Sequence, residues 1–76
     1  MTKSIFETFP GITIMDSEPA EVRNRFGGES IVLQPEELAV YDYLMGCEMM
    51  GDYKGLRKGL DWFMENNPEA YMVLLD

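Results

Sequence analysis

The sequence predicts a mainly α-helical protein: an antiparallel helical hairpin plus a short terminal helix, preceded by an irregular N-terminal part that can hold one or two short strands. Two observations carry this prediction. The chain has 76 residues, fewer than the roughly 100 to 200 of a typical domain, so there is room for one core only. From Gln34-Pro35 onward most residues tolerate helix, and Gly51-Asp52 interrupts them. We therefore expect one domain over residues 1–76, with an arm over 1–34 and the hairpin with its C-terminal segment over 35–76.

The N-terminal part contains weak and separate signals. Gly11–Met15 holds β-branched residues and is expected to form a short strand. Ser17 is a suitable helix N-cap and Gly27-Gly28 a suitable stop, so two helical turns are expected over Glu18–Phe26. Ser30–Leu33 is the second expected strand.

A first long helix is expected over Glu36–Met50. Glu36 and Glu37 stand where the first turn of a helix favours negative charge. Helical spacing sorts the apolar side chains into two stripes. One stripe comprises Leu38, Tyr41, Met45 and Met49, and the other comprises Val40, Leu44 and Cys47. A helix with two apolar stripes has to be covered on two sides.

A second helix is expected over Tyr53–Asn66, with Asp52 as its N-cap. Leu56, Leu60 and Phe63 lie at helical spacing and form its expected core stripe. Because only a tight corner separates the two long helices, they should pack antiparallel.

The last residues allow two interpretations. Asn67-Pro68-Glu69 is a cap-and-start signal, which favours a short third helix to Leu74. The apolar residues of Tyr71–Leu75 also fit the period of a strand. Residues 69–75 are therefore expected to be helical, with a terminal strand as the alternative.

The charge balance restricts the kinds of partner. Six Lys and Arg residues against 14 Asp and Glu residues give a formal net charge of −8. Such a surface repels nucleic-acid phosphates and anionic lipid headgroups, so we expect neither direct nucleic-acid binding nor membrane binding. No apolar run approaches the roughly 20 residues of a membrane-spanning helix, and the first residues lack the apolar stretch of a signal peptide. The expected location is the cytoplasm.

Residue types that carry catalysis are scarce. The chain has no histidine, the commonest general base, and no serine or threonine in a nucleophile motif. The single cysteine, Cys47, lies among methionines and is expected to be a buried, structural side chain. The carboxylates follow neither a calcium-loop nor a di-iron spacing and are interpreted as a solvated acidic face. We therefore expect no enzyme activity, no catalytic residues, no cofactor and no metal.

The second helix has one unusual side. Gly55 and Gly59 lie four residues apart and Trp62 follows three residues later, so two bare patches and one large aromatic share that side. Each glycine costs a helix about 1 kcal/mol, and close packing against another segment would recover this loss. That segment is either a partner at a docking or self-association face, or the N-terminal arm with Phe6 and Phe9. The expected interaction face comprises Gly55, Gly59 and Trp62 together with Tyr41, Met45 and Met49 of the preceding helix.

These observations predict a small non-catalytic protein-interaction module. A hydrophobic content of 46% is high for a chain with so little interior, so we expect self-association, as a dimer, and binding of an unknown protein partner. The alternative is an acidic mimic of nucleic acid that blocks a DNA-binding protein. Such a mimic needs carboxylates aligned on one face. Basic residues interrupt the acidic surface, namely Arg23, Arg25, Lys54, Arg57 and Lys58.

The hairpin resembles one unit of a tetratricopeptide repeat. Gly51-Asp52-Tyr53 is similar to the turn of that family, and Leu56, Leu60, Phe63 and Pro68 extend the similarity. The resemblance implies a helix–turn–helix unit. The segment Gly46–Gly51 is about two residues shorter than the family's spacing, and about three repeats are needed for a stable array, so the resemblance serves as an analogy for the hairpin alone.

The C-terminal stretch resembles the ends of small uncharacterised proteins of marine cyanobacterial phages. Arg57–Phe63 and Asn67–Asp76 carry this resemblance. It implies a short protein that acts in the cytoplasm of an infected host cell. It implies no activity and no site residues.

Overall fold

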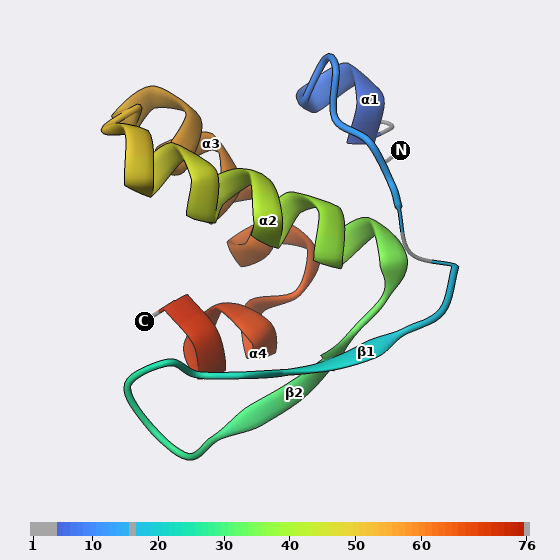
Figure 1. The fold of residues 1–76 in the computed structure, drawn as a ribbon, viewed down its shortest axis with the longest axis vertical. Coiled ribbons are helices and arrows are strands. Elements are labelled where there is room, and N and C mark those ends of the chain that lie inside the picture. Colours follow the sequence, from blue (N-terminus) through green and yellow to red (C-terminus); the bar gives the residue numbers. More distant parts are fainter. Residues whose placement is uncertain (1–4, 16, 76) are drawn as a thin grey trace.

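Two antiparallel helices form the centre of the molecule, with the C-terminal turns lying between them and a two-stranded sheet (Figure 1). The computed structural model describes residues 5–15 and 17–75. In chain order the elements are α1 (Ile5–Thr8), β1 (Ala20–Arg23), β2 (Ser30–Leu33), α2 (Pro35–Met50), α3 (Tyr53–Asn66), α4 (Pro68–Ala70) and the π-helical turn η1 (Tyr71–Leu75). The predicted fold class, mainly α-helical with a helical hairpin and a short terminal helix, is confirmed.

Local hydrogen bonds fix both ends of α2. At its start the backbone N–H of Gln34 donates to the Glu37 carboxylate at 2.8 Å, and Pro35 occupies the first turn, where its missing N–H costs nothing. At its end Gly51 adopts a φ of 75°, a conformation that glycine reaches without steric penalty. The Gly51 N–H donates to the Glu48 carbonyl at 3.3 Å. The helix therefore begins one residue earlier than expected and ends where expected.

The second long helix, α3, spans the expected residues. Asp52 caps it, because the Asp52 Oδ1 accepts a hydrogen bond from the Gly55 N–H at 3.1 Å. The expected core stripe is only partly right: Phe63 is fully buried, whereas Leu56 and Leu60 are half-buried. The reason is that α2 packs closely over the glycine side of α3, which leaves the two leucines beside the contact.

The C-terminal segment is helical, so the alternative of a terminal strand is wrong. Asn67 caps α4, since its Oδ1 accepts from the Ala70 N–H at 3.1 Å. The Asn67 Nδ2 also donates to the Glu37 carboxylate at 2.8 Å. This bond ties the turn after α3 to the first turn of α2. The chain then continues into η1, whose π-helical conformation is rare in proteins.

The predicted helix over Glu18–Phe26 is wrong, because Ala20–Arg23 forms β1. This strand pairs antiparallel with β2, in a register that places Val22 opposite Ile31. The strand expected at Ser30–Leu33 is confirmed. One face of the hairpin turns toward the core, since Leu33 belongs to the buried core and Val22 and Ile31 pack against that core.

Residues 24–29 form the turn of this hairpin. The Asn24 Oδ1 accepts from the backbone N–H groups of Phe26 and Gly27 at 2.7 and 3.1 Å. Asparagine favours this local turn because its short side chain can replace a backbone acceptor. The residues interpreted as a helix stop therefore reverse the chain between two strands.

The strand predicted at Gly11–Met15 is also wrong. Residues 12–15 have no regular structure, and a single helical turn, α1, precedes them. Ile12 and Ile14 are half-buried against the core. Their side chains add to the apolar packing, but their backbone does not pair with another segment. A strand needs such a neighbour to bond its backbone N–H and C=O groups.

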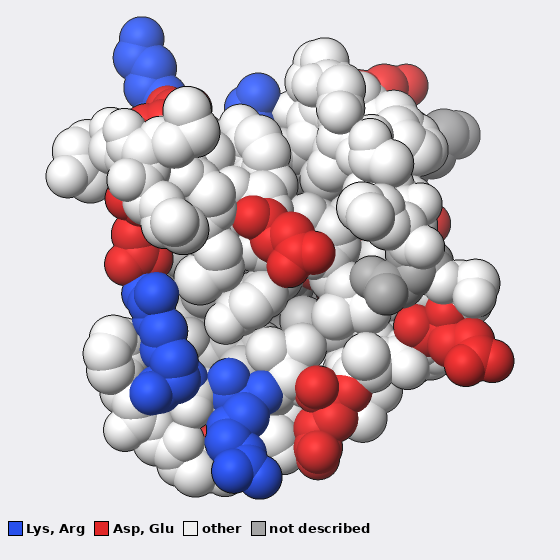
Figure 2. Space-filling view, in the orientation of Figure 1, with Lys and Arg blue, Asp and Glu red and all other residues white. Residues whose placement is uncertain are grey.

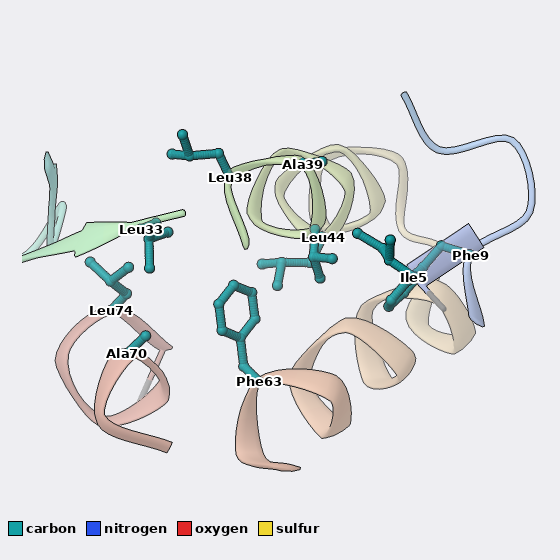
Figure 3. Packing of buried hydrophobic residues seen from close by; sticks show 10 residues of the cluster. Ile5, Phe9, Leu33, Leu38, Ala39, Leu44, Phe63, Ala70 and Leu74 are labelled. Atoms are coloured by element: carbon teal, nitrogen blue, oxygen red, sulfur yellow. The ribbon is translucent and has the colours of Figure 1, made fainter. Parts of the chain in front are cut away.

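The core runs between α2 and α3 and reaches both ends of the molecule. Figure 3 shows Leu44 and Phe63 between the two helices, and both side chains have an exposed fraction of 0%. One end of the core is closed by β2 and the C-terminal turns and the other by the N-terminal arm. The residues at these ends are Leu33, Ala70 and Leu74 on one side, and Ile5 and Phe9 on the other.

Within the described residues, no helix has both the length and the apolar character needed to cross a membrane. The expected absence of a signal peptide rests partly on residues 1–4, which lie outside the described residues.

Candidate functional site

Gly55 and Gly59 lie inside the contact between α2 and α3, and both are buried. A β-carbon on Gly55 would lie 2.6 Å from the Cys47 sulfur and 2.7 Å from the Tyr43 hydroxyl oxygen. A β-carbon on Gly59 would lie 2.9 Å from the β-carbon of Leu44. These separations are shorter than van der Waals contact, so the interior has no room for a side chain at either position. The close approach predicted from the glycine spacing is present, and α2 of the same chain makes it.

This arrangement corrects the predicted interaction face. Because α2 covers them, Gly55 and Gly59 offer no surface to a partner in this fold. The alternative, in which the N-terminal arm fills the glycine groove, is also wrong. Phe9 instead packs edge-on against Tyr43, with ring centroids 5.0 Å apart.

The other four residues of the predicted face lie in different environments. Tyr41 and Met45 are half-buried against the core, and Met49 near the end of α2 is 89% exposed. Trp62 is half-buried and meets the ring of Phe63 edge-on at 5.1 Å. Of the six predicted residues, only Met45 lines the pocket described next.

A pocket of about 540 Å³ lies where the tip of the β-hairpin, α2, α3 and η1 meet. Leu56 and Leu60 of α3 line it, which accounts for their half-buried state. The remaining lining residues are Asn24, Arg25 and Phe26 from the hairpin turn, Leu44, Met45 and Glu48 from α2, Tyr53 from α3, and Leu74 and Leu75 from η1. Five of these eleven residues are leucines, and Asn24, Arg25, Glu48 and Tyr53 add polar groups to the lining.

Three polar side chains at the pocket, those of Asn24, Arg25 and Glu48, are already engaged within the chain. The Arg25 Nη2 lies 2.7 and 2.8 Å from the two carboxylate oxygens of Glu48. The Asn24 Nδ2 donates to the Val73 carbonyl at 2.7 Å. Because the Arg25 and Glu48 side chains are 48% and 42% exposed, their ion pair adds at most about 1 kcal/mol. These bonds join the hairpin tip to α2 and η1 and so define the walls of the pocket.

Two aromatic side chains that line the pocket are exposed. Phe26 is 88% and Tyr53 is 75% exposed. The Arg25 guanidinium lies 5.0 Å from the centre of the Phe26 ring, a cation–π contact that orients the ring. Exposed aromatic side chains beside an apolar pocket are typical of the centre of protein–protein interfaces.

The titratable residues at the pocket are few. They are Arg25, Glu48 and Tyr53, and the first two are paired with each other. Among residues 5–15 and 17–75, no group of three or more cysteine or carboxylate side chains could hold a metal ion. The lining can therefore bind an apolar group, and it presents no pair of free acid and base groups.

Tyr43, Cys47 and Asp52 form a polar cluster around Gly55. The Cys47 thiol donates to the Asp52 Oδ2 at 3.9 Å, and Cys47 is buried, as expected. Burial raises the pKa of Tyr43 above its ordinary value of 10.0, and the hydrogen bond to Cys47 and the charges of Cys47 and Asp52 act in the same direction. None of the three residues lines the pocket.

Tyr43 is expected to make the fold sensitive to alkaline pH. Its raised pKa means that the folded chain keeps the phenol proton more tightly than the unfolded chain does. Stability from this group is thus fully present below pH 10.0 and is lost as the pH rises through the folded pKa. Urea unfolding followed by circular dichroism at rising pH should show a shallower loss of stability in Tyr43→Phe.

Charged side chains are dispersed on the face shown in Figure 2. Acidic and basic side chains are interspersed there, some of them directly beside each other, and two basic side chains lie close together at the lower left, over the hairpin. Arg57 and Asp61 form a further ion pair at 3.3 Å. This face therefore carries no continuous acidic patch.

The pocket is a feature that the sequence analysis missed. A signal for the hairpin was present, because Ala20–Arg23 and Ser30–Leu33 are short segments with β-branched residues, separated by Asn24 and Gly27-Gly28. That signal could have located the hairpin tip. It could not have shown that the tip docks against α2 and η1.

The chain matches no family model, no curated protein and no solved structure.

Proposed function

We propose that this chain is a small, non-catalytic protein-interaction module that binds a protein partner by accepting an apolar side chain into the pocket between the hairpin tip, α2, α3 and η1. The observation that carries the proposal is a pocket with five leucines in its lining, in which Asn24, Arg25 and Glu48 are engaged with partners within the chain. The cytoplasm is its proposed place of action. The resemblance to phage proteins makes this the cytoplasm of an infected cell.

The size and lining of the pocket support an apolar anchor as the bound group. Its volume of about 540 Å³ lies in the range of about 300 to 1,000 Å³ in which binding pockets fall. A polar metabolite would need free donors and acceptors, but Asn24, Arg25 and Glu48 are engaged elsewhere. A leucine or aromatic side chain of a partner would instead be covered by Leu56, Leu60 and their neighbours, in the manner of an interface hot spot.

The alternative of an acidic nucleic-acid mimic has less support. Its basis is the net charge of −8, and a mimic also needs carboxylates in a regular array. The face in Figure 2 carries basic side chains among the acidic ones. Glu48 and Asp61 are each paired with an arginine, which reduces their resemblance to free phosphates.

Selection from a random peptide library tests the pocket. We expect peptides with a leucine or aromatic anchor to be retained by the wild-type chain. Leu60→Glu should weaken their binding by about tenfold or more, the equivalent of about 1.4 kcal/mol, because it places a charge in an apolar pocket.

Met64→Glu is the matched control for this experiment. It lies one helical turn further along α3, is 46% exposed and does not line the pocket. Circular dichroism must show that both variants keep the wild-type helical signal. Equal binding of the selected peptides by the wild type and Leu60→Glu would reject the pocket as the binding site.

Self-association is the second part of the proposed function. The fold leaves large apolar side chains exposed, among them Val32 at 55% and Met72 at 68%, and such a surface favours association with another molecule. The melting temperature of a self-associating chain should then rise with protein concentration. A melt that is independent of concentration, together with the monomer mass of 8.7 kDa in sedimentation equilibrium, would reject this part and leave the pocket unaffected.

A further inference from the structure

The outer edge of β1 has unpaired backbone groups. β1 pairs with β2 alone in a two-stranded sheet, and no described residue makes a backbone hydrogen bond to its other side. The Asn24 N–H donates to the Glu29 carbonyl at 2.8 Å, which fixes the alternation of the ladder. Hydrogen-bonded and non-hydrogen-bonded residue pairs alternate along an antiparallel ladder. The backbone N–H and C=O groups of Val22 therefore point toward Ile31 of β2. The N–H and C=O groups of Glu21 and Arg23 consequently point to the open edge.

The side chains of this edge are complementary to themselves. Glu21 and Arg23 are two residues apart, so both side chains project from the exposed face of the sheet. If a second copy of β1 lies antiparallel with Val22 opposite Val22, Glu21 of each copy faces Arg23 of the other. The same register makes each of these a hydrogen-bonded pair, because the outward backbone groups belong to those two residues.

Other registers are less favourable. A shift of two residues in one direction places Glu21 opposite Glu21, and in the other direction it places Arg23 opposite Arg23. Like charges directly opposite each other destabilise a sheet. Pro19, just before the strand, has no N–H to donate and limits the pairing to the strand itself.

We propose that two copies of this chain associate through their β1 edges into a four-stranded antiparallel sheet, with Glu21 of each copy paired to Arg23 of the other. This proposal rests on the self-association part of the proposed function and supplies its surface. A two-stranded hairpin is marginally stable by itself, and pairing with a second copy gives it two more strands. The two-fold axis passes between the two Val22 residues, which gives the closed symmetric dimer that is commonest among oligomers.

The dimer is in equilibrium with the monomer. β1 has only four residues, so the contact is smaller than the roughly 800 Å² per partner of a standard interface. Glu21 and Arg23, whose side chains pair across the proposed contact, do not line the pocket.

Charge exchange between the two positions tests the register. Sedimentation equilibrium should show that Glu21→Arg and Arg23→Glu each raise the dimer dissociation constant by about tenfold or more, because each puts like charges opposite each other twice. An equimolar mixture of the two variants should associate as a heterodimer, in which both pairs have opposite charges. The double variant E21R/R23E should associate as the wild type does.

The design separates local pairing from the effect of overall charge. Glu21→Arg makes the chain less acidic, which by itself favours association, whereas the proposal expects it to weaken the dimer. Hydrogen exchange gives a second readout: the amides of Glu21 and Arg23 should become more protected as protein concentration rises. A dimer that is unaffected by the single charge changes would overturn this interface while leaving self-association intact. A chain that stays monomeric at every concentration would overturn both.

Discussion

Replacing Gly59 with leucine is expected to destabilise the fold by up to about 2 kcal/mol, because an overpacked contact costs about 1 to 3 kcal/mol and the gain in helix propensity offsets about 0.8 kcal/mol. A β-carbon at this position would lie 2.9 Å from the β-carbon of Leu44. Leu44 is fully buried, and its β-carbon is fixed to the backbone of α2, so rotation of the side chain cannot relieve the clash. The two long helices would have to separate. Urea unfolding followed by circular dichroism measures the loss.

Alanine substitutions sharpen this test. Gly59→Ala already introduces the clashing β-carbon, so we expect it to destabilise the chain despite the better helix propensity of alanine. Gly46→Ala in α2 is the matched control, since nothing lies within 4 Å of its β-carbon position. It should stabilise the chain by about 0.5 to 1 kcal/mol. If both alanine variants are more stable than the wild type, the helices are not in close contact at Gly59.

Replacing Phe9 with alanine is expected to cost about 3 kcal/mol, the lower end of the range for a fully buried phenylalanine. Phe9 is only 1% exposed, and its ring meets Tyr43 edge-on. The Lys58 ammonium lies 5.9 Å from the centre of the same ring. Removal of the ring would therefore leave a cavity between the N-terminal arm and the two long helices.

The size of this effect is large for so small a chain, whose total stability is expected near the lower end of the usual range of about 5 to 15 kcal/mol. The urea midpoint should fall markedly in Phe9→Ala. Met15→Ala changes a side chain of the same arm that is 86% exposed, and its stability should stay within about 0.5 kcal/mol of the wild type. Equal stabilities of Phe9→Ala and Met15→Ala would show that the arm does not anchor the fold in solution.

The sequence by itself determined the helical half of this protein. The ends of the helices are marked by Pro35, Gly51-Asp52 and Asn67-Pro68. These residues act through their own backbone conformation or through hydrogen bonds to near neighbours, so their effect is local and can be predicted without the fold. The burial of Cys47 followed in the same way from its position among apolar residues.

The N-terminal half could not be predicted by the same reasoning. Ser17 and Gly27-Gly28 fit the two ends of a short helix, yet Ala20–Arg23 is a strand. The choice depended on pairing with Ser30–Leu33 and on burial of Leu33 against the C-terminal turns. Contacts between distant residues outweigh weak local preferences when a segment is this short.

Only the tertiary structure decided which surfaces are open to a partner. The spacing of Gly55 and Gly59 predicted a close contact but could not name the segment that makes it, because any chain that approaches the bare side of a helix satisfies the pattern. In the fold α2 fills that position, and Leu56 and Leu60 are left beside it. Their pocket is completed by the hairpin tip, which is distant from α3 in sequence, and by η1, which follows α4. A site assembled from separate elements has no pattern in the sequence, since its geometry exists only after those elements have packed.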